Sequence, residues 1–295
     1  MREFAVKCLF LCVVLLGGCT YVSRWPDGEP SLRLHFLDVG QGLAVLLEYR
    51  GEDCSEGCGR FALFDTGPDS VGVLDSLKAR GVDSLEWVVV SHFHRDHGGG
   101  FMEWGGRPGQ PRVKRLLVGL DSDGAYIRDS VLAVASQNKV PVDTIFRGDT
   151  LWFGDGVKVE VLWPANFIHV EGNGASVVLK VAWDKNVDGL GKKEFDGALL
   201  TADLDTTGER RLLELSPSLK TSLLQVGHHG SAGSSSLHFL SRIEPQSAVV
   251  SVGKKNGYGH PTQSVLNKLK IVLQDSSKIF RTDLQGSLTV EIPRL

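Results

Sequence analysis

The chain has 295 residues, of which 42% are hydrophobic and 23% charged, and its formal net charge is −3 at pH 7. This composition is typical of a globular protein and excludes a flexible low-complexity chain, while the length suits one large domain or two small ones. The slightly negative charge excludes a basic field over the whole molecule, which nucleic-acid-binding proteins commonly have.

The N-terminus is predicted to direct export. A basic start is followed by an apolar run over residues 8–16 and by Leu16-Gly17-Gly18-Cys19. This order is typical of a secretory signal peptide, and the run is shorter than the ~20 residues of a membrane span. Because the last four residues resemble the lipobox of bacterial lipoproteins, we expect a signal peptide at 1–18, a lipid on Cys19 and a tether over 19–31. The protein would then be exported and lipid-anchored to the membrane of the bacterial cell envelope, on its periplasmic or extracellular face, with an uncleaved anchor as the alternative.

Two cysteines lie at the tip of a predicted hairpin. Once the signal peptide and the lipidated residue are set aside, only Cys54 and Cys58 remain, in a polar stretch between two predicted strands. In an oxidising compartment a disulfide between them is expected. A metal-binding pair is the competing interpretation, but a four-cysteine zinc site would need a second pair of cysteines.

Apolar periodicity predicts strands and helices along the rest of the chain. Strands are expected at residues 32–37, 44–49, 61–64, 87–90, 113–120, 144–146, 157–162, 176–183, 197–201, 222–226, 248–252, 279–280 and 287–292. Helices are expected at residues 71–80, 126–138, 208–215, 234–241 and 262–273. The simplest fold for this order is an α/β protein with one domain over residues 32–295, built as an αββα sandwich.

The strongest chemical signal directly follows the apolar run at 87–90. The segment Ser91-His92-Phe93-His94-Arg95-Asp96-His97-Gly98-Gly99 places four potential metal ligands within six residues. Such side chains cannot all lie on one face of a regular element, so we expect a tight loop in which Gly98 to Gly100 let the backbone bend close to a metal. Imidazole and carboxylate groups suit zinc or a similar first-row metal, and two ligand sets can hold two ions. A solvent-exposed polar loop is the alternative.

This segment carries a resemblance to a known family. His92-x-His94-x-Asp96-His97 matches the HxHxDH signature of the metallo-β-lactamase superfamily. Further segments resemble, in order, the hydrolase domain of ComEC-type DNA-uptake (competence) proteins. They lie at residues 36–42, 64–67, 199–203, 226–231, 256–261 and 281–283. The resemblance spans about residues 32–292, nearly the whole of the expected mature chain.

The resemblance implies a centre with two metal ions, Zn²⁺ or Mn²⁺. Its metal ligands would be His92, His94, Asp96, His97, Asp203 and His229. The first two would bind one ion, Asp96 and His97 the other, and Asp203 would bridge them. The sequence does not separate His228 from His229; we favour His229 as the ligand and place His228 near the substrate phosphate. The catalytic residues would be Asp96, Asp203, His228 and His260.

Four residues are expected to shape the site, namely Asp38, Gln41, Asp65 and Asn173. Asp65 would hydrogen-bond the metal loop, although a turn cap is the alternative for it. The superfamily usually supplies a further histidine before the bridging aspartate, and the one candidate here is His169. We expect Asn173 to lie near the first metal and His169 to be an ordinary loop residue. A second departure is Leu43, where the family often has aspartate, and it leaves the details of the substrate open.

The resemblance further implies a metal-dependent hydrolase that uses a metal-activated water. We expect a phosphodiesterase or nuclease that acts on DNA in the cell envelope, working alone or with a protein partner or channel encoded elsewhere. A phosphorylcholine-type esterase, a lactonase or a β-lactamase on the same site is an alternative, because one fold hosts many activities. A non-catalytic envelope lipoprotein that acts as a scaffold is a further alternative.

Overall fold

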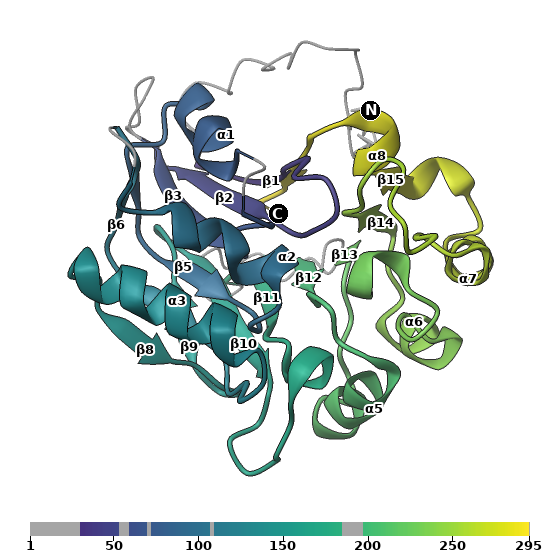
Figure 1. Cartoon of the computed structure of the whole chain (residues 1–295). Helices are drawn as coiled ribbons and strands as arrows, with labels where there is room; N and C mark the ends of the chain where they lie inside the picture. The colour runs from purple at the N-terminus through teal and green to yellow at the C-terminus, as the bar shows by residue number, and fades with distance from the viewer. Residues whose placement is uncertain (1–29, 53–58, 70–71, 107–108, 185–196, 295) are drawn as a thin grey trace, which may run out of the picture.

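Two seven-stranded sheets pack face to face, and helices cover the outer face of each sheet (Figure 1). The computed structural model describes residues 30–52, 59–69, 72–106, 109–184 and 197–294. The expected signal peptide, lipidated Cys19, most of the tether and the Cys54–Cys58 pair lie outside these residues. Within the described ranges, none of the helices has both the length and the hydropathy that crossing a bilayer requires.

The first sheet is built mainly from the N-terminal half of the chain and is closed at one edge by the last strand. Its strands, in spatial order, are β16 (Leu288–Ile292), β1 (Ser31–Phe36), β2 (Val45–Arg50), β3 (Arg60–Phe64), β5 (Val88–Val90), β7 (Leu116–Val118) and β8 (Val142–Thr144). The pair β2–β3 is antiparallel, as the predicted hairpin requires. From β3 onwards the strands are parallel, so their carboxyl ends meet at one edge of the sheet.

The second sheet contains the C-terminal half. Its strands, in spatial order, are β15 (Ile279–Arg281), β14 (Ser247–Val250), β13 (Leu223–Gln225), β12 (Ala198–Leu200), β11 (Val178–Trp183), β10 (Val157–Trp163) and β9 (Thr150–Trp152). The strands β12 to β15 are parallel. A small separate sheet pairs β4 (Ser84–Leu85) with β6 (Arg112–Val113).

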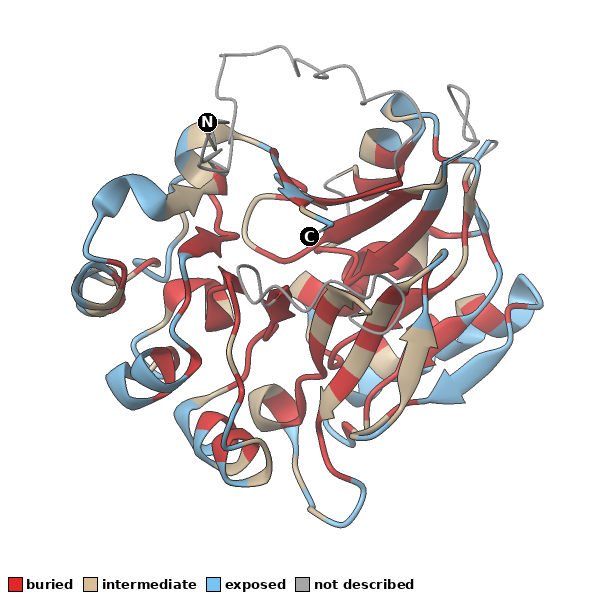
Figure 2. Ribbon diagram, turned by 180° about the vertical axis from the view of Figure 1, so that it is seen from behind, coloured by how far each residue is buried: buried red, intermediate tan, exposed pale blue. Residues whose placement is uncertain are grey.

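Three apolar clusters hold these layers together, and they confirm the predicted αββα sandwich. The cluster between the sheets includes Phe36, Phe64 and Leu200. A second cluster packs α1 (Val73–Ala79) and α3 (Ala125–Gln137) on the first sheet, and a third packs α5 (Thr206–Leu215), α6 (Leu237–Ile243) and α7 (Gln263–Leu273) on the second. Figure 2 shows buried and less buried residues alternating along strands of the second sheet, as in the pattern of β10.

The predictions that were wrong concern exposed edges and short elements. The strand expected at 144–146 is β8 at Val142–Thr144, whose three residues are exposed; the apolar Ile145 that suggested a strand is buried beyond the strand's end. The edge strand β9 was missed, because its residues show no buried face. The single strand expected at 113–120 is divided into β6 and β7, which pair with different neighbours.

The metal loop also differs from the expectation. Where a tight loop was expected, Arg95–Gly98 forms one helical turn, α2, and Gly99–Glu103 continues as a 3₁₀ helix, η1. The adjacent glycines serve close packing, because a Cβ on Gly100 would lie 2.2 Å from the backbone oxygen of Thr66. Gly42 packs as closely, since its Cβ would lie 2.6 Å from the backbone oxygen of Asp96. Small residues thus bring two turns of the first sheet against α2.

Two further short helices, η4 (Ser276–Lys278) and α8 (Thr282–Gln285), flank β15.

A Gly100→Ala substitution should therefore destabilise the protein. The added methyl group would overlap a backbone carbonyl that cannot rotate away, so we expect a loss of about 1–3 kcal/mol in the free energy of unfolding. Urea denaturation measures the loss. Gly106→Ala is the matched control, because the nearest atom to a Cβ there lies 3.8 Å away. Equal stabilities of the two variants would contradict the packing explanation.

Candidate metal centre

The candidate site lies where the carboxyl ends of strands from both sheets meet. The metal loop follows β5 of the first sheet, and Asp65 follows the neighbouring β3. From the second sheet, Asp203 lies just beyond β12, and η3 (Gly227–Gly230), which contains the histidine pair, follows β13. Parallel strands end at the same edge, so residues far apart in the sequence converge there. Ligands in open sheets commonly bind at such an edge.

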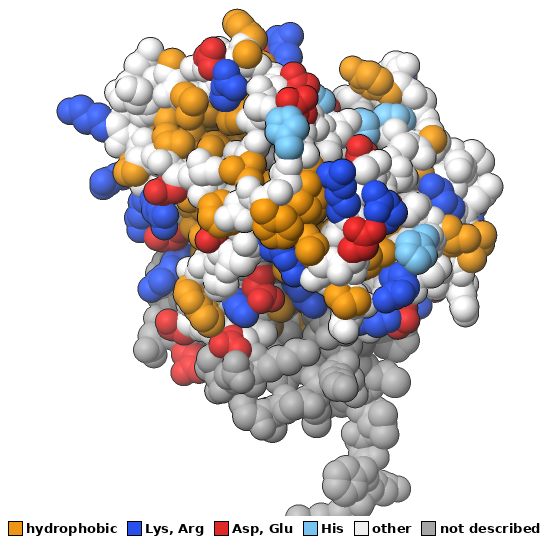
Figure 3. All heavy atoms as spheres, turned by 90° about the horizontal axis from the view of Figure 1, so that it is seen from below, with side chains coloured by type: hydrophobic (Ala, Val, Ile, Leu, Met, Phe, Trp, Pro, Cys, Tyr) orange, Lys and Arg blue, Asp and Glu red, His pale blue; other side chains and the backbone are white. Residues whose placement is uncertain are grey.

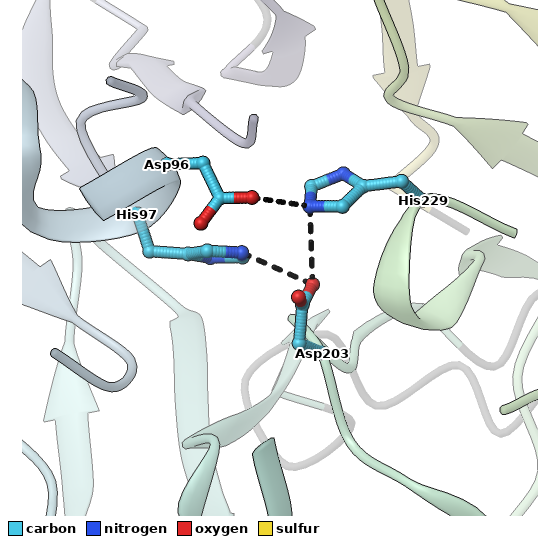
Figure 4. Close-up of side chains that lie close together, drawn as sticks. All are labelled: Asp96, His97, Asp203 and His229. Atoms are coloured by element: carbon cyan, nitrogen blue, oxygen red, sulfur yellow. Dashed lines mark ion pairs between the residues drawn. The ribbon is translucent and has the colours of Figure 1, made fainter. Parts of the chain in front are cut away.

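Four side chains form the central group of the site, namely Asp96, His97, Asp203 and His229 (Figure 4). Potential ligand atoms of all four lie within 4.8 Å of one another. The Nε2 atom of His97 is 3.0 Å from Oδ1 of Asp203. The Nε2 atom of His229 is 3.2 Å from Oδ2 of Asp96 and 3.4 Å from Oδ1 of Asp203. Two imidazole nitrogens and two carboxylates at this spacing are a donor set that suits zinc or manganese.

Several buried polar atoms of the site make no hydrogen bond within the described part of the chain. They are Nε2 of His92, His97 and His229, Oδ1 of Asp203, Oδ1 of Asn173 and Nδ1 of His260. An unsatisfied buried polar atom costs about 1–3 kcal/mol, so such a concentration calls for an explanation. A cation supplies it for the nitrogens and carboxylate oxygens, because each can donate a lone pair to a metal. The residues present fit a bound metal.

The other nitrogen of each central histidine is fixed by a hydrogen bond. Nδ1 of His97 lies 2.7 Å from Oδ2 of Asp65, which also accepts a hydrogen bond from Oγ of Ser91. Nδ1 of His229 lies 2.8 Å from the backbone oxygen of Ser251. Both partners are acceptors, so in its neutral form each ring carries its proton on Nδ1 and has its lone pair on Nε2, the nitrogen that would face a metal. Partners of this kind orient metal ligands and make them more basic.

His92 and His94, expected at a first metal ion, lie beside the central group. The ring of His92 is 4.5 Å from the ring of His94 and 4.3 Å from that of His97, measured between centroids. Nδ1 of His92 contacts the hydroxyl groups of Ser91 at 3.0 Å and Ser176 at 3.4 Å. These contacts use Nδ1 only; the buried Nε2 makes no hydrogen bond within the described residues and could bind a metal.

His228 lies on the outer side of the central group, with its ring 6.2 Å from that of its neighbour His229, between centroids. Both residues have left-handed backbone conformations, with φ of 49° and 53°. Nε2 of His228 is 3.6 Å from Oδ2 of Asp203, and its ring contacts the side chain of Asn173 at 3.4 Å. His229 thus belongs to the central group, whereas His228 and Asn173 line its approach.

The remaining expected residues have different surroundings. His260 lies 5.8 Å from the ring of His228, between centroids. Gln41 accepts a hydrogen bond from the backbone of Gly253 at 3.1 Å and so joins two loops at the edge of the site. Asp38 is exposed; its side chain accepts a hydrogen bond from the backbone of Gly40, and its backbone nitrogen donates to Oγ of Ser287 at 2.9 Å. His169 is exposed and pairs with Glu171 at 3.2 Å, as an ordinary loop residue would.

Sequence reasoning missed Asp121, which supports the site from outside. Its carboxylate accepts hydrogen bonds from the backbone of Phe93 in the metal loop and of Gly172 in the loop that carries Asn173, both at 3.0 Å. It also accepts one from Asp123 at 2.9 Å. Its position in the sequence could have revealed it: Asp121 comes just after β7, the parallel neighbour of β5, so it lies at the same edge of the sheet as the metal loop.

In the central group, neighbouring side chains of opposite charge shift each other's pKa values. Burial alone would raise the pKa of Asp203, but the rings of His229 and His97 hold it well below its usual value. Burial alone would lower the pKa of His97, but the carboxylates of Asp203, Asp65 and Asp96 raise it well above its usual value. Burial lowers the pKa of His92, leaving its ring neutral, which is the form that binds metals. A metal that binds the central group must displace protons from it.

An Asp65→Asn variant should bind its metal about 10- to 100-fold more weakly, because outer partners of ligating histidines contribute about this much. The amide can turn its NH₂ group toward His97, which would favour a proton on the nitrogen that faces the metal. Competition with a chromophoric chelator measures the affinity. Asp155→Asn, in an exposed turn between β9 and β10, is the matched control. An unchanged affinity in a folded Asp65→Asn protein would contradict the assignment.

Comparisons with known proteins agree with this geometry. A family model described as the metallo-beta-lactamase superfamily matches residues 37–179. "Competence protein ComA" of Neisseria gonorrhoeae is 34% identical over 290 residues, covering 96% of this chain and 35% of that protein. "ComE operon protein 3" of Bacillus subtilis is 31% identical over 300 residues, covering 94% and 34%. The chain therefore spans about a third of the length of these relatives.

A solved structure supports the fold alone. The "metallo-beta-lactamase fold protein YhfI" of Bacillus subtilis aligns with 86% of this chain and 98% of its own, at a TM-score of 0.51 and 11% sequence identity. At so low an identity the likeness extends to the architecture and not to the reaction.

Proposed function

The chain belongs to the metallo-β-lactamase superfamily of metal-dependent hydrolases, and from this membership we propose that it is a phosphodiesterase that cleaves DNA in the cell envelope. The observation that carries the proposal is the convergence of Asp96, His97, Asp203 and His229, in which Nε2 of both histidines and Oδ1 of Asp203 are buried without a hydrogen bond among the described residues. The DNA substrate is favoured because the segments around the site resemble DNA-uptake proteins and two relatives carry the names of competence proteins or operons.

The central group would hold one ion, and His92 and His94, with Asn173 nearby, a second. When bound, two such cations supply a water acidified to a pKa of about 7 and positive charge beside the phosphoryl oxygens. Asp203 would hold its carboxylate between the two ligand sets. His228 and Asn173, on the approach to Asp203, would donate hydrogen bonds to the phosphate and fix its orientation. Hydrolysis adds the water oxygen to phosphorus, breaks one P–O ester bond and leaves a proton on the departing oxygen.

The surface charge sets a limit on how the substrate is held. Figure 3 shows basic and acidic side chains interspersed on the face it draws, without a field of one sign. Together with the net charge of −3, this argues against a long electrostatic track for duplex DNA. The proposal therefore requires recognition near the metal centre itself.

The test is hydrolysis by the full chain loaded with manganese or zinc. Single-stranded DNA and bis-p-nitrophenyl phosphate are the substrates, with a lactone, a β-lactam and p-nitrophenyl phosphorylcholine as comparisons. We expect turnover of both phosphodiesters, and loss of it on chelation. No turnover of either phosphodiester by protein shown to contain metal would reject the proposal. Tight metal binding without activity on any ester would favour a scaffold instead.

We further propose that the protein is exported and attached to the envelope through lipid on Cys19. The leader pattern at residues 1–19 supports this. Expression of the full chain in bacteria, with labelling by a radioactive fatty acid, tests it: Cys19→Ser should lose the label and leave the membrane fraction. A Cys19→Ser protein that keeps the label would contradict the lipid assignment.

A further inference from the structure

A tyrosine at the edge of the candidate site exposes an aromatic ring to solvent. Tyr258 has 73% of its surface exposed, although it lies in the loop between β14 and α7 that borders the metal centre. Its ring stacks at an offset against the ring of His260, at 5.7 Å between centroids and an angle of 26° between planes. The ring of Tyr258 therefore has one aromatic neighbour and is otherwise largely open to solvent.

The loop that carries Tyr258 is held in one shape by the side chain of Asn256. Its Nδ2 donates to the backbone oxygens of Gly253 at 2.9 Å and His260 at 2.7 Å. Its Oδ1 accepts from the backbone nitrogens of Tyr258 at 3.2 Å and His260 at 3.0 Å. The ring of Tyr258 is exposed but the backbone beneath it is fixed, so a ligand that stacks on it finds a preorganised surface.

A row of rings connects this surface with the metal centre. His260 contacts Tyr258 on one side and the ring of His228 on the other, at 5.8 Å between centroids. His228 in turn lies 3.6 Å from Asp203. A phosphate held by His228 would therefore have an aromatic ring close to its adjoining nucleoside. The exposed Lys254 and Lys255 in the same loop place positive charge on this side.

We propose that Tyr258 is a stacking platform for a nucleobase next to the phosphate that is cleaved, and that the substrate is therefore single-stranded. This inference rests on the proposed function. A base in a duplex is stacked on both faces and hidden from a protein ring, whereas a base in a single strand offers its face to an aromatic side chain. Stacking needs no sequence preference, and the exposed Lys254 and Lys255 in the same loop would supply the positive charge that accompanies stacking at single-strand sites.

Binding of a single-stranded oligonucleotide with hydrolysis-resistant phosphorothioate linkages tests the proposal independently of turnover. Fluorescence anisotropy with the metal-loaded full chain should show that Tyr258→Ala raises Kd about 10-fold, which is the scale of one stacked base. Tyr258→Phe should bind like the wild type, because the ring face and not the hydroxyl is used. Trp152→Ala removes an aromatic side chain of similar exposure from the remote edge strand β9 and should leave Kd unchanged.

An abasic series locates the contact. In the wild type, removing single bases one at a time should raise Kd strongly at one position and little elsewhere. In Tyr258→Ala the same abasic strand should bind no more weakly than the complete strand, since the partner ring is already absent. A 2-aminopurine at that position should be quenched by the wild type and not by Tyr258→Ala.

The outcomes separate the two proposals. If the metal-loaded wild type hydrolyses no phosphodiester, the proposed function fails. If it hydrolyses single-stranded DNA but Tyr258→Ala binds within twofold of the wild type, the stacking platform is wrong. Equal loss in Tyr258→Phe and Tyr258→Ala, or duplex binding as tight as single-strand binding, would also overturn it.

Discussion

An Asp203→Ala protein is expected to lose hydrolysis by about three orders of magnitude or more, because metal-based charge stabilisation contributes several kcal/mol and each 1.36 kcal/mol is tenfold in rate. Asp203 is 1% exposed and is the one carboxylate within contact distance of His97, His228 and His229 among the described residues. Its removal would leave these rings without their shared partner and would remove a carboxylate that would help to hold the metal.

Metal content and rate should be measured on the same preparation. Mass spectrometry is expected to show less than the full complement of metal in Asp203→Ala, and the rate with a phosphodiester should fall by more than the metal content. Asp205→Ala is a matched control two residues away. It removes the cap of α5, where the carboxylate accepts from Gly208 at 2.7 Å, so it should cost about 1 kcal/mol of stability and keep the metal. Wild-type rates in Asp203→Ala would contradict the site.

Chelation should lower the melting temperature, and by more at high pH than at low pH. A ligand at about 1,000 times its Kd stabilises a protein by about 4 kcal/mol, which corresponds to roughly 10 °C for a chain of this size. In the metal-free protein the folded-state pKa of His97 is raised above the usual 6.5. Its protonated ring therefore stabilises the fold fully below pH 6.5, and this stabilisation is lost as the pH rises through the raised pKa.

In the metal-loaded protein, the stabilisation by the bound metal changes with pH in the opposite direction. A metal competes with protons for the imidazole nitrogens, so its affinity rises with pH. The lowered pKa of Asp203 keeps that carboxylate ionised throughout, so it adds no change between pH 6 and 9. The difference in melting temperature between loaded and chelated protein should therefore grow from pH 6 to pH 9. Differential scanning calorimetry measures it, and a difference that shrinks would contradict metal binding by this group.

The sandwich could be predicted because its inner strands carry strong patterns. Runs such as Val88–Val90 are apolar throughout, and helices such as α7 show apolar residues at regular spacing. Edge strands gave no such signal. In β8 the residues Val142, Asp143 and Thr144 are all exposed, so only pairing with β7 reveals the strand. Helix boundaries were off by one to three residues, as in α6, because capping contacts decide them.

The candidate site could be located from sequence because its residues form short motifs at strand ends. The motif could not distinguish His228 from His229, since only the fold shows that His229 is buried against Asp96 whereas His228 is partly exposed. Nor could it reveal the outer partners Asp121 and Ser251, which contact the site through the fold and not through neighbouring residues. The acceptors that set the histidine tautomers therefore required the structure.

The division of the ligands between the sheets has a consequence for assembly. His97 comes from the N-terminal half, whereas Asp203 and His229 come from the C-terminal half. Neither half alone carries the whole set, so an ion would act as a reversible cross-link between residues that are far apart in the sequence. Two fragments divided between β10 and β11 would then be expected to associate more tightly when the metal is supplied than when it is withheld.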